Sequence, residues 1–222
     1  MTFGMRVRGF LAAIFLLNSV VCESSWARIY PVSKAQRLAR LHHARELLGK
    51  HYSRSSVREG ENVKRINSAI YRRTRERLPK AHRQEYKRVA QTIIDEAFKH
   101  NFDPVFLMSV IEQESSFIPT RKGALDEIGL MQLRPGTAEW IAEKYGMKWK
   151  GSKSLYDPVV NIRIGAAYLA YLREIFDSHA QLYLAAYNMG ARNVASAREK
   201  NVWPKDYPGG VMRHYVDFYQ SL

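Results

Sequence analysis

The sequence predicts an all-α protein, and three observations support that prediction. Nearly every long segment carries apolar residues at helical spacing. No run alternates apolar and polar residues for long enough to indicate a strand. Two Asp-Pro pairs stand where a helix is expected to begin. At 222 residues and 46% hydrophobic residues, the chain can hold one domain of ordinary size plus an extension.

Residues 1–27 are predicted to be a cleavable signal peptide. Arg6 and Arg8 precede the twelve-residue apolar run FLAAIFLLNSVV, which is short for a membrane span. Ser25 and Ala27 then give the small-x-small arrangement that signal peptidase accepts. We therefore expect cleavage after Ala27 and a periplasmic protein, with an uncleaved anchor as the alternative.

The single cysteine, Cys22, lies in this leader. Lipid attachment there is a weaker alternative, because Val21 is a poor residue to precede a lipidated cysteine. Cleavage after Ala27 would leave no cysteine, so the mature fold is expected to depend on its core without disulfides.

The net charge of +14 is distributed unevenly along the chain. Residues 28–91 hold eighteen Lys or Arg against five Asp or Glu, a net of +13, whereas residues 92–222 hold fifteen of each. The basic character therefore belongs to a helical extension, placed at 28–82, that precedes an electrically balanced domain at 83–222. Three roles stay open for the extension: a solvated face packed on the domain, anchoring to acidic envelope polymers, or docking to a partner.

The extension is expected to contain two helices. Leu38, Leu41 and Leu48 mark one face of a helix that ends near Gly49. After a polar loop, a second basic helix is expected over residues 61–78, stopping at a proline.

Five further helices are expected in the domain, and one of them begins near Thr137. Residues 86–97 repeat apolar side chains at i, i+3, i+4 and i+7. Asp103 and Asp157 are expected to be the N-caps of the next helix and of a later long helix, each followed by proline. The run 179–190 is expected to form a helix that closes at its asparagine and glycine.

The run VFLMSVIEQESSF (105–117) carries two glutamates near the end of an almost wholly apolar helix. At 100° per residue, Glu114 falls about 20° from Leu107, in the centre of the apolar face. Glu112 falls about 140° away, on the polar side, and is predicted to be solvated or salt-bridged.

An apolar setting would raise the pKa of Glu114, because burial disfavours the charged form. A carboxylic acid that is still protonated near neutral pH can give its proton to a poor leaving group. The helix position alone leaves a second interpretation open, in which Glu114 is a capped or paired acid at a helix end.

Two later motifs add sugar-binding chemistry. The loop after the helix contains GLMQL, with a close-approach glycine and the amide of Gln132. The motif AAYNMG places the phenol of Tyr187 beside the amide of Asn188. Phenols and amides can stack on and hydrogen-bond to sugars, although a Tyr-Asn pair at a helix end is also a common cap.

In order and spacing, ESSF, GLMQL with PGTA, and AAYNMG resemble the soluble-type lytic transglycosylases of the SLT domain family, glycoside hydrolase family 23, which are relatives of goose-type lysozyme. The resemblance covers roughly residues 83 to 218. It implies a lysozyme-like helical domain that cleaves the β-1,4 bond between N-acetylmuramic acid and N-acetylglucosamine in peptidoglycan, leaving a 1,6-anhydro end.

The same resemblance implies that Glu114 is the sole catalytic carboxylate, acting first as acid and then as base. It also implies a set of substrate-binding residues: Ser115, Met131, Gln132, Tyr187, Asn188 and, more weakly, Tyr215.

The sequence departs from the family pattern in two places. The family has a small-residue turn directly before GLMQ. Here either Gly123-Ala124 is that turn, with LDEI separating it from Gly129, or Asp126 and Glu127 replace it. They could be solvated, or one could position a water and turn the enzyme into a hydrolysing muramidase. Met189, Ala191 and Arg192 also replace small residues, proline and glycine, which bears on the local turn but not on Tyr187 or Asn188.

No metal or nucleotide motif is present in the sequence, so we expect no metal and no cofactor. Glycan strands of peptidoglycan are the expected partner, an envelope-spanning secretion or assembly complex is a further candidate, and a monomer is expected. A non-catalytic peptidoglycan-binding or scaffold protein is the rival from another class. Nucleic acid is excluded as a partner by the predicted leader and by the lack of a recognised motif.

Overall fold

The computed structural model describes residues 34–58 and 63–222, and this part of the chain is built from helices, short 3-10 turns and loops. Within these residues the only β-like pairings are isolated bridges in the loop after the 104–115 helix. The all-α prediction is therefore confirmed. The predicted leader, with Cys22 and the cleavage point after Ala27, lies outside the described residues.

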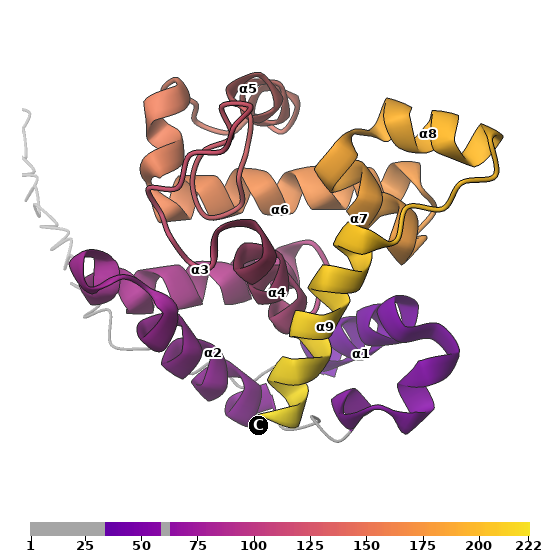
Figure 1. The fold of residues 1–222 in the computed structure, drawn as a ribbon. Helices are drawn as coiled ribbons and strands as arrows, with labels where there is room; N and C mark the ends of the chain where they lie inside the picture. Colours follow the sequence, from indigo (N-terminus) through magenta and orange to yellow (C-terminus); the bar gives the residue numbers. More distant parts are fainter. Residues whose placement is uncertain (1–33, 59–62) are drawn as a thin grey trace, which may run out of the picture. The chain divides into compact units, whose positions relative to one another are not determined.

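Figure 1 shows the arrangement of the helices. The α-helices are α1 (Lys34–Leu48), α2 (Val63–Arg77), α3 (Tyr86–Lys99), α4 (Pro104–Ser115), α5 (Pro135–Lys144), α6 (Pro158–Ile175), α7 (Ala180–Met189), α8 (Ala191–Glu199) and α9 (Asp206–Gln220). The 3-10 turns are η1 (Gly49–Arg54), η2 (Ser56–Arg58), η3 (Lys80–Glu85) and η4 (Ser152–Tyr156). The expected helices are all present, and α8 and α9 add two that the sequence patterns did not indicate.

Both Asp-Pro pairs begin helices as predicted. The side chain of Asp103 accepts a hydrogen bond from the backbone N–H of Val105 at 3.0 Å, which caps α4. Asp157 accepts one from the backbone N–H of Val159 at 2.8 Å, which caps α6. In each case the proline occupies the first turn, where its missing N–H has no partner to lose.

Helix α4 is the centre of the core. It packs against α2, α3 and α9. From Pro104 to Ile111 every residue of the helix is buried. Only the last turn of α4 reaches the edge of the core, where side chains become partly exposed to solvent. That turn contains Glu114.

The described residues before and after residue 82 belong to one compact unit. Helix α1 contributes fully buried side chains to a polar cluster shared with α4 and α9. Arg40 donates to the hydroxyl of Tyr219 at 3.0 Å and lies 3.6 Å from the carboxylate of Asp103. The hydroxyl groups of Tyr215 and Tyr219 donate to the same carboxylate at 2.8 and 2.6 Å. The basic extension is thus joined to the domain through a common core.

No helix among the described residues is both long and apolar enough to cross a bilayer.

Candidate active site

The last turn of α4 opens into a pocket of about 550 Å³. The loop after α4, the start of α5, the middle of α6 and the α7–α8 junction form its walls. The lining residues are Glu114, Leu125, Glu127, Gln132, Leu133, Arg134, Thr137, Tyr168, Tyr187, Asn188, Met189, Gly190 and Asn193. We call this cavity the Glu114 pocket.

Glu114 is a partly buried acid with one hydroxyl partner. The hydroxyl of Tyr207, at the start of α9, donates to Glu114 Oε1 at 2.5 Å. Burial raises the pKa of Glu114 from its ordinary value of 4.5 to about 7, against the lowering effect of the Tyr207 hydrogen bond. The nearby charge of Glu127 adds to the rise and that of Arg121 opposes it. The carboxyl is therefore protonated through much of the range below neutral pH, as a general acid requires.

Tyr207 is a site residue that sequence reasoning missed. Burial and the negative charge of Glu114 raise the pKa of Tyr207 well above its ordinary value, so the phenol remains a hydrogen-bond donor. It lies 93 positions after Glu114 in a segment without a helical apolar pattern at its start. No signal in the sequence pairs the two residues, because only the packing of α9 beside α4 brings them together.

The GLMQL loop is held in place by a buried asparagine of α6. Asn161 accepts from the backbone N–H of Met131 at 2.7 Å and donates to the carbonyls of Ile128 and Leu155 at 2.8 and 3.0 Å. Gly129 has φ +84°, and a Cβ there would meet the Asn161 amide at 2.3 Å. Glycine is needed at this position for both its backbone conformation and its close approach.

Gln132 lies on the pocket wall with its amide nitrogen already engaged. Nε2 donates to the carbonyls of Arg121 and Gly129 at 3.1 and 2.9 Å. These bonds use the donors of the amide, so its oxygen remains as an acceptor. The predicted role of Gln132 as a cleft residue fits this position.

Tyr187 and Asn188 also line the pocket, at the end of α7. The hydroxyl of Tyr187 donates to the backbone carbonyl of Met131 at 2.8 Å, and its ring lies 5.3 Å from that of Tyr168. Tyr187 thereby ties α7 to the GLMQL loop, while Asn188 is exposed toward solvent. Two aromatic rings and two amides stand around the acid.

Three of the predicted substrate-binding residues do not line the pocket. Ser115 is fully buried and donates to the carbonyl of Leu130 at 2.8 Å, so it positions the loop. The Met131 side chain is fully buried and packs against Gly165 of α6. Tyr215 is fully buried, with its hydroxyl on Asp103. Ser115 and Met131 therefore hold the GLMQL loop in place without lining the pocket. The assignment of Tyr215 to the cleft is corrected, because its hydroxyl donates to Asp103 inside the core.

The neighbouring acids differ in their surroundings. Glu112 forms a two-point ion pair with Arg77, which confirms the predicted salt-bridged role. Asp126 is 76% exposed and pairs with Lys122 at 2.9 Å, outside the pocket lining. Glu127 does line the pocket.

Both carboxylate oxygens of Glu127 accept hydrogen bonds. Oε2 accepts from the backbone N–H of Leu125 at 2.9 Å and Oε1 from Nε of Arg134 at 3.0 Å. Although burial alone would raise it, these bonds hold the pKa of Glu127 below its ordinary value. The pocket therefore combines Glu114, an acid with a raised pKa, and Glu127, an acid with a lowered pKa.

In the described part of the chain, no group of three His, Cys, Asp or Glu side chains is arranged to hold a metal ion. The hydrogen-bond donors around the Glu114 pocket are hydroxyl, amide and guanidinium groups.

An all-α domain that carries one acid of raised pKa in an amide- and phenol-lined pocket has the features of a lysozyme-like glycan-cleaving domain. Residues 91–208 match the transglycosylase SLT domain, which covers more than half of the chain. The chain belongs to this family.

Curated relatives support the same assignment. A putative soluble lytic murein transglycosylase from Haemophilus influenzae is 33% identical over 118 residues, 53% of this chain and 19% of that protein. The soluble lytic murein transglycosylase of Escherichia coli is 30% identical over 130 residues, 58% of this chain and 19% of its own length. A transglycosylase of Enterobacteria phage PRD1 is 35% identical over 126 residues, 56% and 42% of the two chains.

Among solved structures, an inactive glutamate-to-glutamine mutant of lytic transglycosylase Slt from Pseudomonas aeruginosa matches with a TM-score of 0.55 and 30% identity. The match covers 59% of this chain and 24% of that one. The chain thus spans about a fifth of the length of its larger relatives, through the shared domain.

Proposed function

We propose that this protein is a peptidoglycan lytic transglycosylase that cleaves the β-1,4 bond between N-acetylmuramic acid and N-acetylglucosamine. The observation that carries the proposal is the position of Glu114 in a pocket lined by amides and phenols, where burial raises the pKa of its carboxyl to about 7. Family membership supports it independently. A module that only bound glycan would have no use for a desolvated acid at this point.

In the proposed reaction, Glu114 gives its proton to the glycosidic oxygen as the C1–O4 bond breaks, and the N-acetylglucosamine end leaves as an alcohol. The carboxylate then takes the proton of the muramic C6 hydroxyl as that oxygen bonds to C1. The product has a 1,6-anhydro end, and Glu114 is protonated again. The N-acetyl group of the substrate stabilises the cationic centre, which is why a second carboxylate is not required.

Tyr207 and Gln132 are proposed to assist without exchanging protons. The Tyr207 hydroxyl stabilises the carboxylate that forms after the first step, because it donates to Oε1 at 2.5 Å. The free amide oxygen of Gln132 and the exposed amide of Asn188 are placed to bind sugar hydroxyl or N-acetyl groups. The rings of Tyr168 and Tyr187 provide an apolar wall.

Hydrolysis of the same bond is a second candidate, because Glu127 is an ionised carboxylate on the pocket wall. A carboxylate there could position a water for attack at C1. The hydrogen bonds from Leu125 and Arg134 to both of its oxygens argue against such a role, since a water would have to share them. Asp126 is less suitable still, because it is exposed and paired with Lys122.

Digestion of purified peptidoglycan with mass analysis of the released fragments tests the proposal. We expect anhydro-muropeptides from the wild type and none from Glu114→Gln. Glu112→Gln is the matched control, because that acid lies on the same helix but pairs with Arg77 away from the pocket.

Reducing muropeptides that disappear in Glu127→Gln would favour the hydrolytic candidate. If the wild type released nothing, the catalytic proposal would be refuted and the binding role would remain. Secretion to the periplasm through residues 1–27 is part of the proposal, and N-terminal sequencing of the exported protein tests it by showing whether the chain begins at Arg28.

A further inference from the structure

A second pocket lies on the basic part of the chain, away from the residues that line the Glu114 pocket. It has a volume of about 560 Å³ and is open to solvent. Its lining residues come from α2, η3 and the start of α3, and they are Tyr71, Arg72, Arg75, Glu76, Arg83 and Tyr86. We call it the arginine pocket. It lies outside residues 91–208, so it is not part of the domain that the family shares.

The arginines of α2 fall into two groups, one that contacts other helices and one that lines the arginine pocket. Arg73 donates to the hydroxyl of Ser221, and Arg77 pairs with Glu112, so both are used to hold α2 against α4 and α9. Arg72 and Arg75 project from the exposed side of the same helix into the arginine pocket. The pocket arginines are therefore not required for these internal contacts.

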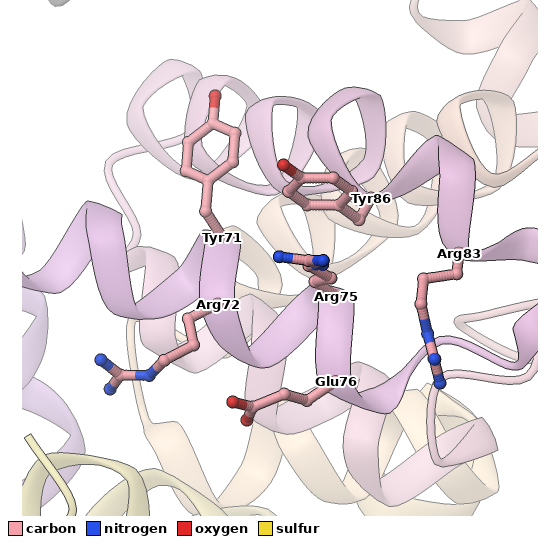
Figure 2. A pocket seen from close by; sticks show the side chains of 6 residues that line it. All are labelled: Tyr71, Arg72, Arg75, Glu76, Arg83 and Tyr86. Carbon is pink, nitrogen blue, oxygen red and sulfur yellow. The ribbon is translucent and has the colours of Figure 1, made fainter.

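The guanidinium groups of the pocket are available to a ligand. Within the described residues, the side chains of Arg72 and Arg83 make no hydrogen bond or ion pair. Arg75 lies over the ring of Tyr86, with its guanidinium carbon 5.7 Å from the ring centroid. Figure 2 shows Arg75 between Arg72 and Arg83, with its planar group beside the Tyr86 ring. Stacking on a ring orients a guanidinium and leaves its edge N–H groups free to donate.

The two tyrosines and the glutamate complete a mixed lining. Tyr71 is held by its hydroxyl, which donates to Gln91 at 2.5 Å, so its ring is a fixed wall. Glu76 contributes one negative charge beside three positive ones. A ligand that suits this lining carries more than one carboxylate for the arginines, aliphatic carbon for the rings and an amino group for Glu76. A phosphate-only polymer would satisfy the arginines but would be repelled by Glu76.

We propose that the arginine pocket binds the peptide stems of peptidoglycan through their carboxylates. This inference rests on the proposed function, since it takes the same polymer as substrate. Peptide stems recur along each glycan strand, so a chain held at the arginine pocket raises the local concentration of strand at the Glu114 pocket. Binding at this site should weaken as salt rises, because the contacts are exposed.

The first test measures binding of the full chain to purified insoluble peptidoglycan by co-sedimentation, with every variant in a Glu114→Gln background so that the polymer is not digested. Substituting Arg72, Arg75 and Arg83 together by Gln is expected to weaken binding about tenfold. The matched control replaces Lys50, Arg54 and Arg58 by Gln. These residues are exposed, belong to the same basic segment and change the net charge equally.

We expect the control triple variant to bind within about twofold of its parent. Equal losses in both triple variants would show general charge attraction and overturn the site, as would no loss in the arginine-pocket variant. A thermal melt of each variant separates loss of binding from loss of fold.

The second test titrates the protein with a free stem peptide by calorimetry, and it does not depend on catalysis. Binding that is lost when the peptide carboxylates are amidated, and lost in the Arg72, Arg75 and Arg83 variant, supports the proposal. Binding of inorganic phosphate or a single-stranded oligonucleotide at the same arginines, with none of the peptide, would overturn it. If the wild type failed to cleave peptidoglycan but bound the stem peptide here, the proposed function would fall and this site would stand.

Discussion

The raised pKa of Glu114 makes a quantitative prediction about stability. The pKa is about 7 in the folded protein against an ordinary value of 4.5. Below pH 4.5 the group is protonated whether or not the chain is folded. As the pH rises from 4.5 to 7, the unfolded chain releases this proton while the folded chain keeps it, so the free energy of unfolding falls. Above pH 7 both states are ionised and the loss is complete.

The size of the loss follows from the shift. A rise from 4.5 to about 7 corresponds to at most about 3.5 kcal/mol, since each pKa unit is worth about 1.4 kcal/mol. The pocket is open to solvent on one side, which reduces the measured value to roughly 2 kcal/mol. Glu114→Gln removes the titrating group while keeping an acceptor for the Tyr207 hydroxyl. The variant should therefore match the wild type near pH 4.5 and be more stable by roughly 2 kcal/mol at pH 8.

Urea denaturation at pH 4.5, 5.5, 6.5, 7.5 and 8.5, followed by circular dichroism, measures this difference. Glu112→Gln is the control, because its carboxylate lies on the same helix but pairs with Arg77 outside the Glu114 pocket. Its stability relative to the wild type should not rise by roughly 2 kcal/mol between pH 4.5 and 8.5.

A stability difference between Glu114→Gln and the wild type that did not change between pH 4.5 and 8.5 would refute the reasoning. It would mean that Glu114 is hydrated in the folded protein and has an ordinary pKa. The proposed general acid would then lack its physical basis.

Three further outcomes are expected. Tyr207→Phe removes the hydrogen bond that lowers the pKa of Glu114. The alkaline limb of the pH-activity profile should therefore move above its wild-type position near pH 7. A shift of that limb to lower pH would contradict this. Asn161→Ala removes the side-chain partner of the Met131 N–H and of the Ile128 and Leu155 carbonyls, although the Leu133 N–H still donates to Ile128. This should cost about 3 kcal/mol in urea denaturation and be marked by loss of activity in the folded fraction. Arg40→Leu leaves the fully buried Asp103 without its cation and should cost about 3 kcal/mol; an unchanged denaturation midpoint would show that α1 is dispensable.

The sequence by itself determined the local structure and which of the two glutamates lies on the apolar face of its helix. The apolar spacing of 86–97 and the Asp103-Pro104 and Asp157-Pro158 pairs predicted α3, α4 and α6, because helix periodicity and capping depend on residues a few positions apart. The same spacing separated Glu114 from Glu112 within a single helix turn, and the structure pairs Glu112 with Arg77 as the polar position indicated.

The surroundings of that acid were decided only by the tertiary structure. Tyr207 reaches Glu114 across 93 positions, and Asn161 reaches Met131 across 30, so no local pattern could pair them. For the same reason the prediction that Tyr215 lines the cleft was wrong. Its hydroxyl donates to Asp103, 112 positions away, inside the core. Side chains separated by many positions meet where helices cross, and the positions of those crossings depend on how the whole core packs.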